Sequence, residues 1–292
     1  MLTTLKKMLF HVEKQLLSDV LNANSISSTE YGIFGYLNGN GARRGKPTLL
    51  NTCSDVYELV TNTSIFPKIE RMLRKAKIKY TVTYKMVDFS RFYAEFKLET
   101  GGVSVGNKKD LIFPIIRVEH SYNGLLKYKI TFGWFRMICS NGLTVPVAGK
   151  EDQNITITGK HTKQILQSLN LLFEKLDFFT KNADKYTEKF HIIAERKVEN
   201  WAARVEYVME ASGIGKRGLE QISAKIEEES KKLYAGKVSD WLIYNAFNYH
   251  IYNAKTKEGK DYDTAPNLRH DQDKKVFDTI FSSEGELAEV EA

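Results

Sequence analysis

Cysteines, long apolar runs and clustered histidines are scarce in this sequence, and each absence removes a class of protein. The two cysteines, Cys53 and Cys139, lie far apart, so neither a disulfide framework nor a cysteine zinc site is expected. No run of eighteen apolar residues occurs, so no transmembrane helix is predicted. The six histidines are dispersed, with none at the i, i+4 spacing of a metal pair. We therefore predict a cytoplasmic protein without a metal or other cofactor.

The N-terminal stretch mixes charges into its apolar positions. Residues 1–17, MLTTLKKMLFHVEKQLL, contain no small-residue cleavage site. The pattern favours an amphipathic helix over a signal peptide.

Charge is distributed unevenly along the chain, whose formal net charge is +7. Residues 1–150 hold 22 Lys and Arg against 11 Asp and Glu, whereas residues 151–281 hold 21 of each sign. The last residues, from 282 onward, carry four glutamates and no cation. A basic half beside a neutral half indicates a polyanionic partner, most often nucleic acid, although solubility alone also explains it.

Two periodicities divide the chain into strands and helices. Apolar residues recur at helical spacing from 64 to 80. Apolar and polar residues then alternate over 81–86, 91–99, 111–122 and 125–140. Asn123-Gly124, between the last two runs, is a strong hairpin signal because both residues tolerate positive φ. After Lys160 the periodicity is helical again.

These patterns predict an α+β fold, with a mainly antiparallel sheet and flanking helices, followed by a helical C-terminal region. We expect a basic α/β region with the sheet over residues 1–150 and a helical region over 151–281. Residues 282–292 are predicted to be an acidic disordered tail.

Arg136 is an unusual residue for its position. It continues the face of a strand on which Tyr128, Ile130, Phe132 and Trp134 are expected to be buried, just before the turn residues 139–142. Arginine at the end of a sheet pairs readily with a carboxylate. Both a structural ion pair and a contact with a ligand are therefore open for this side chain.

The basic half contains two further candidate contacts for phosphate. The glycine-rich loop 38–48 does not fit a phosphate-binding loop of nucleotide hydrolases, because Pro47 replaces the required hydroxyl residue. It still offers Arg43, Arg44 and Lys46 to a phosphate backbone, unless it is simply a solvated turn. The predicted helix 64–80 adds Arg71, Arg74 and Lys75.

The predicted sheet mixes aromatic and basic residues, as in proteins that hold single strands by stacking. We expect a charged groove whose contacts are Lys85, Arg91, Tyr93, Lys127, Lys129, Phe135 and Arg136. Alternate residues must build the core. Tyr93 and Phe135 are the aromatics that we expect to be exposed.

The stretch MEASGIGKRGLEQI, residues 209–222, resembles the helix-hairpin-helix element of DNA-binding proteins. The resemblance implies phosphate contacts from the backbone of Gly213 and Gly215 and the side chains of Lys216 and Arg217. Leu219 departs from the pattern, which usually has a small residue there. A glycine helix C-cap is the structural alternative.

No catalytic constellation is evident, so an enzyme is not predicted. His270, Asp271 and Asp273 gather acid and imidazole near the C-terminus and are the best place to suspect a metal. A charge cluster at a helix N-terminus explains them without a metal and is the favoured interpretation. A metal-dependent nuclease is the function that would use them.

Four stretches resemble an uncharacterised phage/plasmid-like family that includes the prophage YfjQ and YafZ proteins. They are residues 28–40, 53–62, 117–143 and 239–254. The resemblance implies a protein of a mobile element in a bacterial host cell, and no activity. The successive hairpins are also similar in topology to the core of strand-annealing recombination proteins.

The sequence therefore predicts a non-enzymatic DNA-binding protein of a phage or mobile element, preferring single strands and acting in recombination or replication. A homo-oligomer is compatible with this reading. The alternative is a protein-interaction factor that counteracts a host defence system. Its basic half would meet an acidic protein, and the aromatic and asparagine-rich helix 240–253 would be the interface.

Overall fold

The computed structural model describes most of the chain, and its compact units alternate along the sequence. The described residues are 5, 7–21, 30–37, 46–137, 142–143, 156–159, 169–253 and 266–283. The first unit comprises Met1–Thr100, Ile115–Phe132 and Lys150–Phe179, and the second comprises Gly101–Pro114, Gly133–Gly149 and Thr180–Ala292. Each unit thus combines segments from before and after residue 150.

The first unit begins with a small antiparallel sheet in the order β1-β2-β3. Its strands are β1 (His11–Leu16), β2 (Tyr31–Tyr36) and β3 (Thr48–Cys53), and the short helix α2 (Leu17–Leu21) follows β1 in the chain. The helix expected over residues 1–17 is therefore wrong for His11–Leu16. This segment pairs with β2 along its whole length, from His11 opposite Tyr36 to Leu16 opposite Tyr31. Pairing across the sheet has overridden local helical periodicity.

The main sheet of the first unit has the order β10-β8-β7-β5-β4. Its strands are β4 (Tyr80–Val87), β5 (Arg91–Leu98), β7 (Asn107–Ser121), β8 (Tyr128–Arg136) and β10 (Thr156–Gly159). The pairs β4–β5, β5–β7 and β8–β10 are antiparallel. Gly124 has φ of +74° in the turn between β7 and β8, as the Asn-Gly signal predicted.

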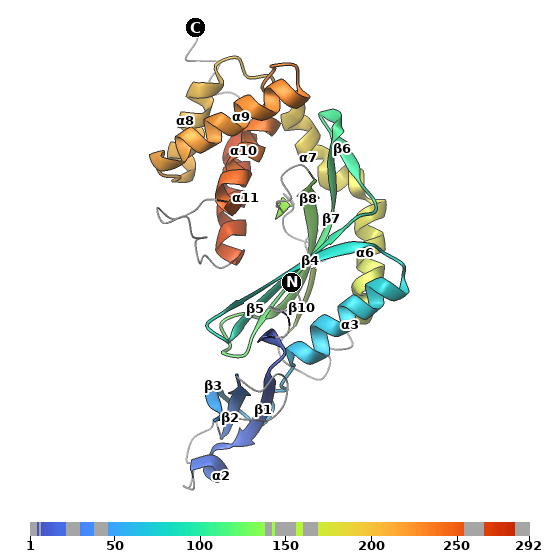
Figure 1. Cartoon of the computed structure of the whole chain (residues 1–292), viewed down its shortest axis with the longest axis vertical. Helices are drawn as coiled ribbons and strands as arrows, with labels where there is room; N and C mark the ends of the chain where they lie inside the picture. The colour runs from blue at the N-terminus through green and yellow to red at the C-terminus, as the bar shows by residue number, and fades with distance from the viewer. Residues whose placement is uncertain are drawn as a thin grey trace. The chain divides into compact units, whose positions relative to one another are not determined.

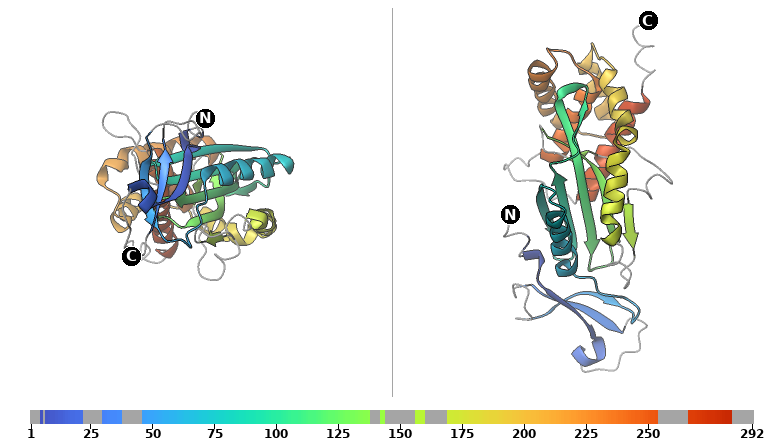
Figure 2. Two further views of the ribbon diagram at one scale, coloured as in Figure 1. Left: turned by 90° about the horizontal axis from the view of Figure 1, so that it is seen from below. Right: turned by 90° about the vertical axis from the view of Figure 1, so that its right-hand side faces the viewer.

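One face of this sheet is apolar and packs against two helices, α3 (Asn62–Lys75) and α6 (Leu172–Lys181). Both helices lie on the same side of the sheet (Figures 1 and 2). The Phe66 ring of α3 contacts the rings of Tyr84 and His120, and Phe179 of α6 stacks on Phe132 of β8. The core predicted from the alternation of β8 is confirmed, because its even-numbered side chains are buried.

The second unit is mainly helical. Its helices are α7 (Ala183–Glu195), α8 (Trp201–Ser212), η2 (Lys216–Gly218), α9 (Leu219–Leu233), α10 (Asp240–Asn253) and α11 (Pro266–Ser282), preceded in the first unit by η1 (Leu169–Leu171). Two short strands, β6 (Val103–Val105) and β9 (Gly142–Leu143), pair with the ends of β7 and β8 that belong to this unit. Together with the sheet, these helices confirm the predicted α+β fold.

Helix α10 is the centre of the second unit. It contacts α7, α9 and α11 (Figure 1). Its residues 240–248 are all buried, and the polar members Asp240, Asn245 and Asn248 form hydrogen bonds within the unit. Within the interface that was expected on 240–253, residues 240–248 are therefore used inside the unit, whereas Tyr249, His250, Tyr252 and Asn253 are half-buried.

The C-terminal helix ends close to the predicted position. α11 extends to Ser282, and Ser283 is still buried. Residues 284–292 of the predicted acidic tail lie outside the described residues. None of the helices in the described ranges has the length and apolar composition needed to cross a membrane.

Candidate functional site

The outer side of α3 carries a stripe of cations. Residues three and four apart share a helix face, and the buried residues Ile65, Ile69 and Leu73 define the inner side. The opposite side holds the cationic stripe, which consists of Lys68, Arg71, Arg74 and Lys75. Arg71, Arg74 and Lys75 are exposed. The structure thus gathers the three cations predicted as contacts on this helix, together with Lys68.

The one carboxylate of α3 is held toward the sheet. Glu70 accepts hydrogen bonds from the hydroxyls of Tyr80, at 3.3 Å, and Tyr84. Burial raises the pKa of Tyr84, and Glu70 raises it further, so the phenol remains a donor. Arg74 approaches Glu70 at 3.4 Å. Glu70 therefore neutralises part of the stripe at Arg74 only.

The end of α3 adds one more exposed cation. Lys77 has φ of +58° and ends the helix, with its N–H bonded to the Arg74 carbonyl and the Ile78 N–H bonded to the Leu73 carbonyl. Cations in the last turn also interact favourably with the helix dipole. The stripe therefore has a structural benefit besides any contact with a partner.

The second face of the main sheet is mixed, because charged residues share it with the buried Ile115 and Tyr93. Alternation along each strand places the half-buried residues opposite to the apolar face that α3 covers. We call this surface the mixed sheet face, and its charged members are Lys85, Arg91, Glu95, Lys97, Arg117, Glu119 and Lys129. Lys85, Arg91 and Lys129 were predicted as contacts. Arg117, which lies opposite Glu95 in the register, was missed.

Cross-strand register orders the charges of the mixed sheet face. Glu95 lies opposite Arg117, and their side chains form an ion pair at 3.2 Å. Arg91 pairs with Asp88 in the preceding turn. Burial lowers the pKa of Lys97, against the attraction of Glu95, and Arg117 lowers it further. The face holds five cations, and with Asp88 included it holds three carboxylates.

The aromatic residues that were expected to be exposed are buried. Tyr93 is 4% exposed and Phe135 is 6% exposed. Tyr93 lies in a central strand between Lys85 and Glu119, and Phe135 contacts the ring of Phe113. The expectation of stacking platforms at these two residues is wrong, because neighbours on both sides of a strand cover its side chains.

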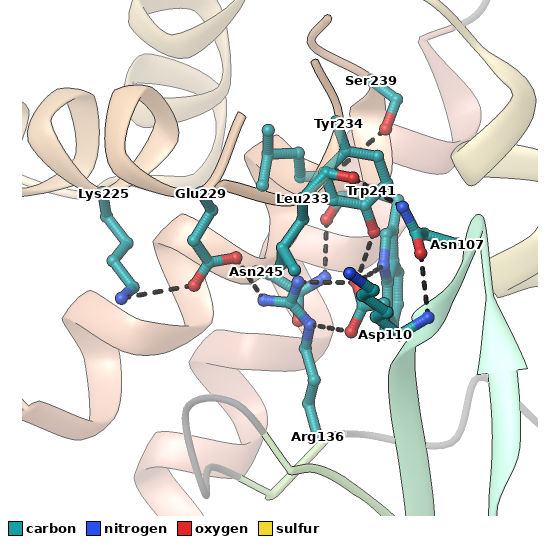
Figure 3. A network of polar contacts seen from close by, with 12 residues as sticks. Asn107, Asp110, Arg136, Lys225, Glu229, Leu233, Tyr234, Ser239, Trp241 and Asn245 are labelled. Carbon is teal, nitrogen blue, oxygen red and sulfur yellow. Dashed lines mark hydrogen bonds and ion pairs between the residues drawn. The ribbon is translucent and has the colours of Figure 1, made fainter. Parts of the chain in front are cut away.

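Arg136 is buried in the second unit and forms the ion pair that was one of its two predicted roles. It is 0% exposed. Its Nε and Nη2 atoms donate to the two carboxylate oxygens of Asp110, each at 2.6 Å, and Nη1 donates to Glu229. Figure 3 shows the guanidinium between these carboxylates. Arg136 therefore has no surface for nucleic acid, and its prediction as a contact is wrong.

The Arg136 network joins four elements of the second unit. Asp110 of β7 also accepts from the indole N–H of Trp241, at 2.9 Å, and from the hydroxyl of Tyr234. Burial raises the pKa of Tyr234, and the Asp110 charge adds to this effect. The network thus ties β7 and β8 to the end of α9 and the start of α10.

Charge in this network is balanced by a second cation. Burial by itself would lower the pKa of Lys225, but Glu228 and Glu229 raise it above its usual value. Lys225 lies 3.3 Å from Glu229. Glu229 therefore has two cationic partners, whereas Asp110 pairs with Arg136 (Figure 3).

The glycine stretch after α8 has the geometry of a helix C-cap. Gly213 has φ of +73°, and its N–H bonds to the Glu210 carbonyl, while the Ile214 N–H bonds to the Met209 carbonyl. Gly215, Lys216 and Arg217 follow in an exposed turn. The C-cap alternative is confirmed, and phosphate binding by this turn stays a prediction.

The remaining predicted residues are dispersed. Lys46 and Lys127 are exposed, whereas Arg43 and Arg44 lie outside the described residues. On α11, Asp271 is exposed, but Asp273 is buried and accepts from Tyr244 and Asn248. Within the described part of the chain, no group of three or more His, Cys, Asp or Glu residues could hold a metal.

The Arg136 network makes a prediction about stability. We expect Arg136→Met to lower the free energy of unfolding by about 3–5 kcal/mol, because Asp110 is left as a buried charge without a cation. Adding Asp110→Asn should recover part of this loss, since Glu229 retains Lys225. Urea unfolding of the wild type, both single variants and the double variant measures the coupling. A double variant that loses the sum of the two single effects would contradict the role of charge pairing.

Two glycines of the turn before α9 form a matched pair. A Cβ at Gly218 would lie 2.7 Å from Nε2 of His250, whereas a Cβ at Gly215 would meet nothing within 4 Å. We expect Gly218→Ala to destabilise the protein by about 1–3 kcal/mol through overpacking. Gly215→Ala should be neutral or slightly stabilising, because its φ is −67°. The melting temperatures of the two variants and the wild type measure this difference. Equal changes in melting temperature for Gly218→Ala and Gly215→Ala would contradict close packing at Gly218.

Comparison with known proteins gives a family and no activity. The family model described as Domain of unknown function (DUF932) matches residues 49–277, which is most of the chain. No curated protein and no solved structure is similar enough to match. The predicted membership of an uncharacterised family is confirmed at this level, and phage or plasmid origin stays a prediction. The chain belongs to the family of the Domain of unknown function (DUF932).

Proposed function

We propose that this protein is a non-enzymatic nucleic-acid-binding protein that contacts the phosphate backbone through the cationic stripe of α3. The observation that supports the proposal is the exposure of Arg71, Arg74 and Lys75 on one side of the helix, while Glu70 is held toward the sheet. Arginine and lysine side chains contact phosphate oxygens and release the counterions condensed on the nucleic acid.

Binding through this stripe depends little on base sequence. Phosphate contacts fix the position of a protein on the strand and do not read bases. A preference for single strands was expected from exposed aromatic residues, but Tyr93 and Phe135 are buried. Base stacking on these two residues is therefore not part of the proposed binding mode. The affinities for single strands and for duplexes are compared in the test below.

The biological part of the proposal rests on the resemblance to mobile-element proteins. A sequence-independent DNA-binding protein of a phage or plasmid fits a role in recombination or replication, where strands of any sequence must be held. The alternative role against a host defence system relied on 240–253 as an interface. Residues 240–248 of that helix are buried, which argues against this alternative.

Three substitutions on α3 test the proposal. We expect Arg71→Gln, Arg74→Gln and Lys75→Gln together to weaken binding of a short oligo-dT roughly ten- to a hundredfold at about 0.1 M salt. The slope of log K against log salt should fall in magnitude by about 2, because each lost phosphate contact removes about 0.7 for a single strand. Fluorescence anisotropy with labelled single strands and duplexes at several salt concentrations measures both quantities.

A matched control removes the same charge from the second unit. Lys231, Lys232 and Lys237 are exposed, and their triple replacement by Gln should leave affinity and salt slope close to those of the wild type. Gln is a good helix former, so circular dichroism should show both variants folded. Absence of binding by the wild type at low salt, or equal losses in the two triple variants, would overturn the proposal.

A further inference from the structure

We infer that the ring of Phe89 stacks on a base of a nucleic-acid single strand, at the end of the main sheet where two hairpin turns meet. This inference rests on the proposed function and deepens it, because it adds a contact with a base to the phosphate contacts of α3. The partner is a single strand, whose unpaired bases can turn toward the protein.

Phe89 occupies a turn position that disfavours a bulky side chain, and its ring is 49% exposed. The turn between β4 and β5 is closed by a hydrogen bond of 3.2 Å from the Ser90 N–H to the Val87 carbonyl. Its two central residues, Asp88 and Phe89, have φ of +54° and +52°. Turns with two positive φ values favour Asn-Gly or Asp-Gly, and a bulky residue there is strained. Glycine would therefore fit the backbone at Phe89 better.

The neighbouring turn, between β7 and β8, holds the strained turn in place. The Ser90 carbonyl accepts a hydrogen bond from the Tyr122 N–H at 2.7 Å, and the Ser90 hydroxyl accepts one from the Asn123 side-chain amide at 2.8 Å. Arg91 pairs with Asp88 across the strained turn itself. Backbone strain persists where the surroundings fix it, and such residues cluster at functional sites. A ring on a fixed turn also loses little freedom when it binds a partner.

Two further exposed apolar side chains lie at the same end of the sheet. Leu125 is 70% exposed, and its N–H is bonded to the Asn123 side chain at 3.1 Å. A Cβ at Gly124 would lie 3.6 Å from Nδ2 of Asn51, so β3 also reaches this turn. Leu49 is on the same side of β3 as Asn51 and is 50% exposed. The ring of Phe89 therefore has apolar neighbours that can contact the bases next to it.

The charges around these apolar side chains indicate the chemistry of the partner. The exposed Lys127 lies two residues after Leu125, and the exposed Lys46 lies three residues before Leu49. The carboxylate of Asp88 is neutralised by Arg91. Apolar side chains bordered by lysines suit a partner with flat apolar groups joined by phosphates. A single strand has this chemistry, and an aromatic ring stacks on any base because each base has a π-face.

Stacking on Phe89 requires a base that is free to leave its neighbours. In a duplex the bases are paired and stacked, so a side chain that contacts a base face must first unstack them at a cost in free energy. Phe89 therefore favours single strands over duplexes. It lies in a turn, outside the strand alternation from which Tyr93 and Phe135 were expected to be exposed.

The variant Phe89→Gly of the whole protein tests the inference. We expect it to bind a short oligo-dT roughly 5- to 100-fold more weakly, because one stacked base is lost. Its affinity for a duplex should change by less than about twofold, and its salt slope should equal that of the wild type, because no charge is removed. Its melting temperature should be unchanged or higher, because glycine relieves the positive φ. Fluorescence anisotropy and thermal unfolding measure these quantities.

Two further variants serve as controls. Phe89→Asn also tolerates positive φ and has no aromatic ring, so it should lose as much affinity for oligo-dT as Phe89→Gly, and it replaces that variant if Phe89→Gly does not fold. Phe178 of α6 is 40% exposed and is a matched aromatic away from the turn. Phe178→Ala should bind oligo-dT within about twofold of the wild type, because it removes no stacked base.

Photochemical cross-linking locates the stacked base directly. One thymine of the oligo-dT is replaced by 5-iodouracil, which joins on irradiation to an aromatic ring stacked on it. We expect the cross-link in the tryptic peptide 86–91, which contains Phe89 as its only aromatic residue.

The outcomes separate this inference from the proposed function. Absence of binding by the wild type would overturn both. Unchanged affinity for oligo-dT in the folded Phe89 variants, or a cross-link outside 86–91, would overturn the stacking and leave the phosphate contacts of α3 standing. A lower melting temperature of Phe89→Gly, with equal losses of affinity for single strands and duplexes, would show that Phe89 only supports the fold, and would also overturn the inference.

Discussion

The second unit depends on the ion pair between Arg136 and Asp110 in its interior. A buried guanidinium is tolerated only when its charge and its donors are satisfied. Two carboxylates, an indole and a phenol meet this requirement around Arg136 and Asp110. The partners come from β7, from α9 and its C-cap Tyr234, and from α10, so satisfying Arg136 of β8 fixes the positions of these four elements.

A second buried arginine organises the end of the same unit. Arg204 donates to both carboxylate oxygens of Asp240, at 2.9 and 3.0 Å, and to the Ile280 carbonyl at 3.0 Å. The last carbonyls of a helix have no partner within it. Arg204 thus completes the C-terminal end of α11 from α8, while Asp240 at the start of α10 neutralises it. Both buried arginines join the helix α10 to elements distant in sequence.

Local sequence patterns predicted the helices and strands of this fold better than the contacts that these elements make with one another. The alternation of Tyr128–Arg136 identified the buried face of β8 correctly, and Asn123-Gly124 marked its turn. Glu229, however, lies 93 residues from Arg136 in the sequence. A local periodicity covers only a few turns or strands, so it could not predict this ion pair. The strand β1 was missed for the same reason, since its conformation depends on pairing with β2. The prediction that Tyr93 is exposed was wrong, because the exposure of a strand residue depends on its neighbours on the adjacent strands.

The same limit applies to charge. The basic excess of residues 1–150 was visible in the sequence, but pairing decides which cations remain for a partner. Each arginine of the main sheet takes part in an ion pair, Arg91 with Asp88, Arg117 with Glu95 and Arg136 with Asp110. The planar guanidinium suits such pairs, whereas lysine is a more flexible point charge. Arg71, Arg74 and Lys75 on the outer side of α3 are exposed, so the proposed phosphate contacts lie there and not at the buried Arg136.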